Sequence, residues 1–133
     1  MEYDDKPPVK VAARLLQQFQ YQYKDNLSAA LIVCGYDNID GPQIWSVGMG
    51  GTTMRLPFTM SGSGSAFIYG WCDANFKENM TKQEALEFVK TAATLAMFRD
   101  NSSGGIIRTM DITKDGYTRG VIKFNDLKNP KDI

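Results

Sequence analysis

Histidine is absent from this 133-residue sequence, and cysteine occurs only twice, as Cys34 and Cys72. Without histidine the chain has neither a Ser-His-Asp nor a Cys-His catalytic group, and zinc loses one of its usual ligands. The two cysteines show no metal-ligand spacing. We therefore expect no metal and no cofactor, and we expect both cysteines to be buried free thiols, as in a reducing compartment.

Excess charge and long apolar runs are absent too. Lysine plus arginine and aspartate plus glutamate each number 15, so the formal net charge is zero. No basic patch or charge run appears, which argues against nucleic acid as a partner. No run approaches about 18 apolar residues, and the first residues contain no apolar stretch, so we expect neither a membrane partner nor secretion.

What the sequence does have is an ordinary globular composition, in which 43% of the residues are hydrophobic. A chain of this length and composition can bury a core, and we expect residues 1–133 to form a single domain. Residues 125–133 are polar and are expected to be a loose tail.

A helix is predicted over residues 9–23, directly after two prolines. Val11, Leu15, Phe19 and Tyr23 recur at four-residue steps and predict an apolar stripe that faces the core.

Strands and helices then follow in separate groups. Residues 28–36 are continuously apolar and predict a strand buried on both faces. Thr81 and Glu84 form a capping-box pattern at the start of a helix. The remaining predicted elements are strands at 43–48 and 53–56, a helix at 65–77, a helix from 81 to about 98, and a hairpin of 106–112 and 117–124. This order favours an α+β fold of helices on antiparallel sheet over a doubly wound parallel sheet.

Residues 61–65 read SGSGS, just before a predicted helix. Glycine lets such a loop turn sharply, so backbone N–H groups at the helix start could hold an anion. No Gly-Lys-Ser/Thr follows, which argues against a nucleotide phosphate loop. The alternative is a strand-to-helix turn in which a serine serves as N-cap.

Residues 100–105 read DNSSGG, at the end of a predicted helix. Asp100 stands three residues before Ser103, so its carboxylate could hold that hydroxyl and orient a nucleophile elsewhere. The alternative is a helix C-cap with local side-chain bonds, followed by a glycine turn.

The two glycine-serine motifs and the helix between them carry a family resemblance. SGSGSAFIYGWCDANFKENM, followed by RDNSSGG, resembles the proteasome beta subunits, most of all those of the type-1, caspase-like kind, from about residue 9 to about residue 124. The resemblance implies an α+β, N-terminal nucleophile hydrolase fold, an αββα sandwich, here lacking its N-terminal strands. It also implies that Ser63, Asp100 and Ser103 support the N-terminal threonine nucleophile of that family.

The nucleophile itself is expected to be missing. In the family, the threonine and its catalytic lysine and aspartate precede the helix that we predict at 9–23, so the chain resembles the C-terminal two-thirds of a subunit and is expected to be inactive alone. Thr52 follows a glycine, as the family's nucleophile does. However, the positions where the family has its aspartate and lysine hold Ile68 and Glu84. We therefore expect that Thr52 does not act as the nucleophile.

The resemblance implies a 20S proteasome subunit, a threonine endopeptidase that cleaves after acidic residues in the cytoplasm and nucleus. Its partners would be the other alpha and beta subunits in stacked seven-membered rings, with peptides as substrates. The alternative is a catalytically dead structural subunit that fills a ring position. Because the missing strands would leave sheet edges uncovered, we expect the isolated chain to self-associate.

Overall fold

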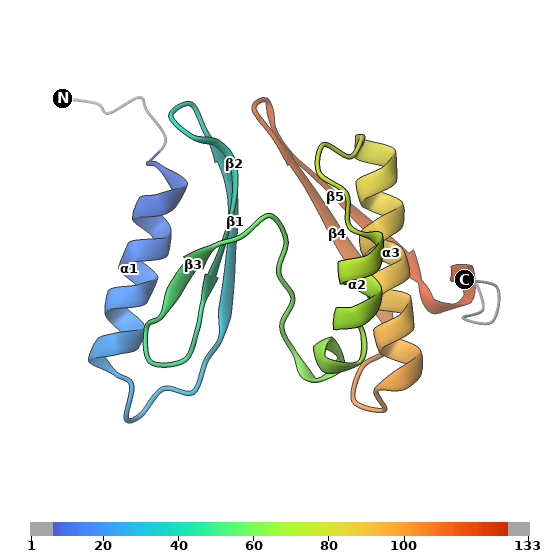
Figure 1. Cartoon of the computed structure of the whole chain (residues 1–133), viewed down its shortest axis with the longest axis horizontal. Helices are drawn as coiled ribbons and strands as arrows, with labels where there is room; N and C mark the ends of the chain where they lie inside the picture. Colours follow the sequence, from blue (N-terminus) through green and yellow to red (C-terminus); the bar gives the residue numbers. More distant parts are fainter. Residues whose placement is uncertain (1–6, 128–133) are drawn as a thin grey trace. The chain divides into compact units, whose positions relative to one another are not determined.

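The computed structural model describes residues 7–127 (Figure 1). They cluster into two compact units, the first formed by residues up to Ser61 with Asp111–Thr118, the second by Gly62–Met110 and the residues from Arg119. That the chain forms one domain stays a prediction. The elements are α1 (Val9–Gln22), β1 (Leu31–Asp37), β2 (Gly41–Val47), β3 (Thr53–Arg55), η1 (Ser63–Phe67), α2 (Tyr69–Asn75), α3 (Lys82–Arg99), β4 (Ile106–Thr113), β5 (Gly116–Lys123) and η2 (Phe124–Asp126).

In the first unit, α1 lies against an antiparallel meander in the order β1-β2-β3 (Figure 1). The register pairs Leu31 with Val47 in β1 and β2, and Val47 with Thr53 in β2 and β3. Val47 is fully buried. The predicted helix and the three predicted strands are confirmed, and with them the α+β class.

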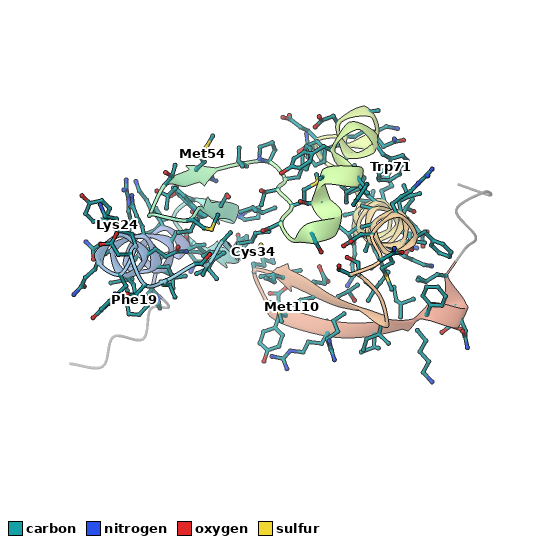
Figure 2. The ribbon with its side chains drawn as sticks, turned by 90° about the horizontal axis from the view of Figure 1, so that it is seen from below. Phe19, Lys24, Cys34, Met54, Trp71 and Met110 are labelled. Carbon is teal, nitrogen blue, oxygen red and sulfur yellow. The ribbon has the colours of Figure 1, made fainter. Side chains whose placement is uncertain are left out.

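The predicted orientation of α1 is wrong. The buried residues of the helix are Val9, Ala13 and Gln20. The predicted apolar stripe is instead exposed, at 45%, 61%, 53% and 43% for Val11, Leu15, Phe19 and Tyr23. Figure 2 shows Phe19 on the side of α1 away from the strands.

Glycines beneath α1 explain which of its faces is buried. A Cβ atom at Gly35 of β1 would lie 2.6 Å from Val9 Cγ2, and one at Gly51 would lie 3.0 Å from the carbonyl oxygen of Gln17. Helix and sheet therefore approach too closely for larger side chains at these positions. The close contact selects the face of α1 that begins with Val9, and the bulky stripe points outward.

The strand β1 is not buried on both faces, contrary to the prediction. Ile32 and Cys34 are exposed, and their exposure alternates with half-buried neighbours. Met54 extends from β3 on the side opposite α1 (Figure 2) and is exposed as well. The reason is that α1 covers only one face of this sheet. Cys34 is thus not a buried thiol, whereas Cys72 is, and both are free.

A buried carboxylate joins the start of α1 to the end of β1. Asp37 accepts hydrogen bonds from the backbone N–H groups of Val9 (2.8 Å), Ile39 (3.0 Å) and Asp40 (2.8 Å) and from Gln43 Nε2 (2.6 Å). These bonds, those from Asp40 and Val9 first, lower the pKa of the Asp37 carboxyl, which desolvation opposes. The negative charge also lies at the positive end of the helix dipole.

In the second unit, the helix predicted at 65–77 is divided. The segment begins as the five-residue 3-10 turn η1 and continues as α2. Ile68 separates the two and is buried together with Cys72, four residues later. Trp71 of α2 stacks on Phe88 of α3, with 5.5 Å between the ring centroids. The short helix is therefore held by aromatic packing on α3.

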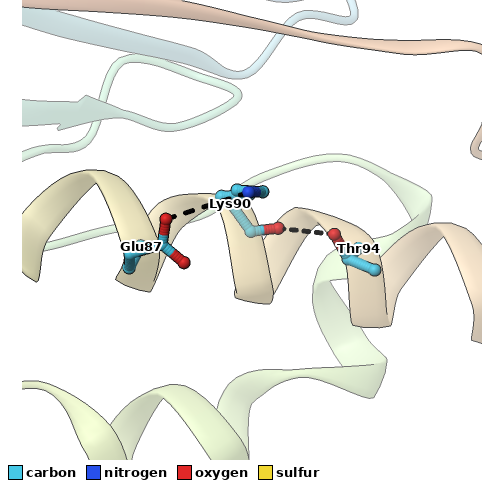
Figure 3. A network of polar contacts seen from close by, with 3 residues as sticks. All are labelled: Glu87, Lys90 and Thr94. Atoms are coloured by element: carbon cyan, nitrogen blue, oxygen red, sulfur yellow. Dashed lines mark hydrogen bonds and ion pairs between the residues drawn. The ribbon is translucent and has the colours of Figure 1, made fainter. Parts of the chain in front are cut away.

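The capping box of α3 is confirmed. Thr81 Oγ1 accepts from the Glu84 N–H (3.3 Å), and the Glu84 carboxylate accepts from the Thr81 N–H (2.7 Å). Further along, Thr94 is buried, and its hydroxyl donates to the carbonyl oxygen of Lys90 at 2.7 Å (Figure 3). This bond satisfies a hydroxyl that would otherwise be costly inside the helix. Figure 3 also shows the 3.8 Å ion pair of Lys90 with Glu87 on α3.

The predicted hairpin is confirmed as β4 and β5, which form a two-stranded sheet. Gly116 has φ 128° at the end of the turn, and Asp115 N–H donates to Thr113 Oγ1 (3.2 Å). The predicted loose tail is wrong at Asn125 and Asp126, which belong to the 3-10 turn η2, and its residues 128–133 lie outside the described residues. Within residues 7–127, no helix is both long and apolar enough to cross a bilayer.

Candidate functional site

Three side chains that the sequence singled out meet in the second unit. Asp100 Oδ2 accepts hydrogen bonds from Ser63 Oγ at 2.7 Å and from Ser103 Oγ at 2.6 Å. Asp100 Oδ1 accepts from the Ser102 N–H at 3.1 Å. We call Ser63, Asp100 and Ser103 the serine-aspartate cluster.

Different local structures position the members of the serine-aspartate cluster. Ser63 is the first residue of η1, and Asp100 is the C-cap of α3. The Asp100 N–H still bonds to Ala96 as in a helix (2.8 Å), and the Ser103 N–H returns to the Asp100 carbonyl (3.0 Å). This turn brings the Ser103 hydroxyl back over the carboxylate.

Both interpretations of Asp100 hold in part. Its bonds to Ser102 and Ser103 are local ones at a helix end, as the C-cap alternative predicted. Its bond to Ser63 is not local, since 37 positions separate the two residues. A simple cap does not require that third contact, so capping alone does not account for the cluster.

The cluster favours an ionised aspartate. Its hydrogen bonds, those from Ser103 and Ser63 first and then that from Ser102, lower the pKa of the Asp100 carboxyl, while burial opposes this. An ionised carboxylate only accepts hydrogen bonds, so both serine protons point at it. Each Oγ then has lone pairs left to accept a hydrogen bond from an amine or from water.

Such serines are poorly suited to act as nucleophiles. A nucleophilic hydroxyl needs a base that takes its proton, and a carboxyl with a lowered pKa is a weak base at neutral pH. The arrangement can instead orient a neighbouring donor group. The catalytic role of the cluster stays a prediction.

Of the two alternatives for residues 61–65, the turn with a serine as N-cap is wrong in that detail, and the anion-binding loop stays a prediction. No side chain caps η1, whose N-cap is Gly62. The hydroxyl of Ser65 donates back to the carbonyl oxygen of Gly62 at 2.7 Å, so this serine serves a turn. A 3-10 turn of five residues also lacks the aligned peptides of a longer helix, which an anion site would use.

One residue of the site carried no specific sequence signal. Gly64 is buried, and a Cβ atom there would lie 3.0 Å from Ser103 Oγ and 3.4 Å from Asp100 Oδ2. In sequence, Gly64 differs in no way from Gly62, because both alternate with serine. Only the packing of η1 on α3 distinguishes them.

Thr52 lies in the first unit, in the connection between β2 and β3. Its carbonyl oxygen accepts from the Gly48 N–H at 2.7 Å and closes that turn. The preceding Gly51 is buried and has φ 91°. Cleavage before Thr52 would thus cut a packed turn, which supports the interpretation that Thr52 is no nucleophile.

Other candidate sites are few in the described part of the chain. Residues 7–127 contain no group of three or more His, Cys, Asp or Glu side chains that could hold a metal ion. A shallow hollow lies between α2 and α3, and no member of the serine-aspartate cluster lines it. Its walls are formed by Trp71, Asn75, Lys77, Met80, Glu84, Glu87, Phe88 and Thr91.

Known proteins are similar to this chain over nearly its whole length. Residues 1–112 match the family described as proteasome subunit. The chain is 49% identical over 130 residues to a probable proteasome subunit beta type-1 of Schizosaccharomyces pombe, covering 98% of this chain and 57% of that protein. It is 48% identical over 126 residues to a proteasome subunit beta type-6 of Dictyostelium discoideum, covering 95% and 59%.

A relative that is named neither type-1 nor type-6 is almost as similar to this chain as those two. A proteasome subunit beta type-9 of Mus musculus bactrianus is 44% identical over 127 residues, which cover 96% of this chain and 58% of that protein. The chain thus spans less than two thirds of the length of each of these three relatives.

Proposed function

Because this chain belongs to the proteasome subunit family, we propose that it is part of a beta subunit of the 20S core. Membership confirms the predicted resemblance to proteasome beta subunits, and it agrees with the predicted N-terminal nucleophile hydrolase class. We further propose the type-1, caspase-like kind, a threonine endopeptidase that cleaves after acidic residues. The relative named beta type-1 supports this assignment, and those named type-6 and type-9 leave it as a proposal.

The observation that carries the catalytic proposal is the convergence of Ser63 and Ser103 on Asp100 Oδ2. In the complete subunit an N-terminal threonine, which is none of Ser63, Asp100 and Ser103, would attack the peptide bond. Its free α-amine has a reference pKa near 8, suited to general-base work at neutral pH.

The cluster would position that amine. Each serine Oγ donates a hydrogen bond to Asp100 and can accept one from the amine or from water. Asp100 would then fix both hydroxyls in orientation without itself taking a proton. Ser63, Asp100 and Ser103 are thus supporting residues, and we propose that the chain alone hydrolyses no peptide.

The partners in this proposal are the other alpha and beta subunits in stacked seven-membered rings, with peptides as substrates, in the cytoplasm and nucleus. Co-purification with proteasome subunits, and a tagged chain seen in both compartments, would be expected. Failure to enter the particle in cells would contradict this assignment.

A structural subunit without catalysis remains the second candidate. The observation in its favour is that Asp100 also completes the end of α3, through Ser102 and Ser103. A subunit retained only for packing would keep the same bonds.

The deciding experiment places variants in the complete subunit and in the assembled particle. Asp100→Asn and Ser63→Ala should lower the hydrolysis of peptides with an acidic residue before the scissile bond, by about 100-fold or more. Ser65→Ala is the matched control, since its hydroxyl bonds only to the Gly62 carbonyl in this loop. Unchanged activity in both variants would favour the structural subunit.

A further inference from the structure

The two glycines on either side of Ser63 serve different purposes. Gly62 has φ 98°, a left-handed conformation, but an added Cβ atom there would meet nothing within 4 Å. Gly64 is outside the left-handed region, but its surroundings are closed. A Cβ atom at position 64 would lie 3.0 Å from Ala96 Cβ, 3.0 Å from Ser103 Oγ and 3.4 Å from Asp100 Oδ2. Position 62 thus favours glycine because of its backbone conformation, and position 64 favours glycine because no room is left for a side chain.

The space at Gly64 is the contact between η1 and the last turns of α3. Carbon atoms in ordinary contact lie about 3.5–4.0 Å apart, so a methyl group at position 64 would be too close to Ala96. Ala96 Cβ is part of the α3 backbone geometry and cannot turn aside. The contact with Ala96 is relieved by a shift of η1 by a few tenths of an ångström. The contact with Ser103 is relieved by the same shift or by rotation of the Ser103 hydroxyl away from Asp100.

Both movements affect the serine-aspartate cluster. Ser63 precedes Gly64 on η1, and its 2.7 Å bond to Asp100 connects η1 to α3. A shift of η1 lengthens this bond directly. Rotation of Ser103 instead breaks the 2.6 Å bond within the turn. A side chain at position 64 therefore lengthens or breaks at least one of the two hydroxyl bonds to Asp100.

We propose that Gly64 is a positioning residue, whose missing side chain sets the distance at which Ser63 and Ser103 both reach Asp100. The catalytic meaning of this proposal rests on the proposed function. The contact itself does not, because it can be measured without measuring activity.

The test is the pH titration of the Asp100 carboxyl carbon by NMR in the full 133-residue chain, with Asp100→Asn to assign the signal. The two serine donors lower the pKa of Asp100. Gly64→Ala should therefore shift the titration midpoint upward, as Ser63→Ala should. Gly104→Ala is the matched control, because a Cβ atom there meets nothing within 4 Å and its φ is outside the left-handed region.

The double variant Gly64→Ala with Ala96→Gly removes the opposing methyl group and should return the midpoint part of the way toward the wild-type value. If Gly64→Ala does not fold, the double variant takes its place, and its midpoint should lie above that of Ala96→Gly alone. A midpoint in Gly64→Ala equal to that of the wild type or of Gly104→Ala would overturn the proposal.

Activity separates this proposal from the proposed function. If the midpoint shifts in Gly64→Ala while peptide hydrolysis by the assembled particle is unchanged, Gly64 positions the cluster but the cluster does not serve catalysis. An unshifted midpoint with lost activity contradicts the positioning role and leaves the proposed function standing.

Discussion

Ser63 Oγ donates a 2.7 Å hydrogen bond to Asp100 Oδ2 and so joins two residues that are 37 positions apart. One stands at the start of η1 and the other at the end of α3. Because Ser103 bonds to the same oxygen at 2.6 Å, a single carboxylate oxygen holds two hydroxyl groups. The consequences can be measured in stability as well as in activity.

Asp100→Asn should change how stability depends on acid. The pKa of Asp100 is lowered in the folded chain, so its carboxylate stabilises the fold above its unfolded pKa of about 3.9. That contribution is lost as the pH falls through the lower folded value. Thermal melts from neutral to acidic pH should therefore show a smaller acid loss in Asp100→Asn than in the wild type. Equal acid losses would contradict the lowered pKa, and Asp73→Asn, at an exposed position, serves as control.

Thr52→Ala should leave peptide hydrolysis by the complete, assembled subunit unchanged. Its carbonyl oxygen closes a turn at 2.7 Å, and that backbone bond survives the substitution. The rate of cleavage after acidic residues is the measurement, with Asp100→Asn as the variant expected to lose activity. Loss of about 100-fold or more in Thr52→Ala would show that its hydroxyl takes part in catalysis.

The two buried glutamines of the first unit should respond oppositely to replacement by methionine. Gln43 donates to Asp37 (2.6 Å) and accepts from Trp45 Nε1 (3.0 Å), so Gln43→Met should lower the free energy of unfolding by about 1–3 kcal/mol. Gln20 is 1% exposed, and neither polar atom of its amide has a hydrogen-bond partner within residues 7–127.

Gln20→Met should accordingly raise the free energy of unfolding by about 1 kcal/mol, because it removes an unsatisfied buried amide at similar volume. Denaturant unfolding of the two variants beside the wild type measures both changes. Destabilisation by Gln20→Met similar to that by Gln43→Met would show that the Gln20 amide is hydrogen-bonded in solution.

Thr81→Ala should destabilise the start of α3 by about 1 kcal/mol. The substitution removes the oxygen that accepts from the Glu84 N–H, and with it one half of the capping box. Thr81→Ser keeps the hydroxyl and should retain most of the stability. Amide hydrogen exchange in the first turn of α3 reports the change locally, and equal exchange in all three proteins would contradict the cap.

The isolated chain should self-associate. The outer face of α1 exposes four apolar side chains, Val11, Leu15, Phe19 and Tyr23, and a contiguous apolar surface favours association. Sedimentation velocity should show species larger than one chain, and fewer of them in Leu15→Lys with Phe19→Lys. A monodisperse 15 kDa wild-type chain would overturn this expectation.

Several elements could be predicted because their determinants are close in sequence. Thr81 and Glu84 form the capping box across three positions, and Gly116 ends the turn between β4 and β5. The bounds of α1 likewise follow a proline pair and a four-residue apolar period. Such interactions depend on local backbone geometry, so a single sequence reveals them.

The face that α1 buries could not be predicted in the same way. Its apolar period marks Leu15 and Phe19 as inner residues, but the sheet approaches through Gly35 and Gly51, where larger side chains do not fit. Which surface is covered depends on the partner element, whose shape the periodicity of one helix does not contain.

For the site, the sequence by itself determined the residue types, a serine loop and an aspartate at a helix end. The tertiary structure decided that Ser63 reaches Asp100, and that Gly64 rather than Gly62 makes the approach possible. A contact across 37 positions depends on how closely η1 and α3 pack, and packing distance is a property of two surfaces together.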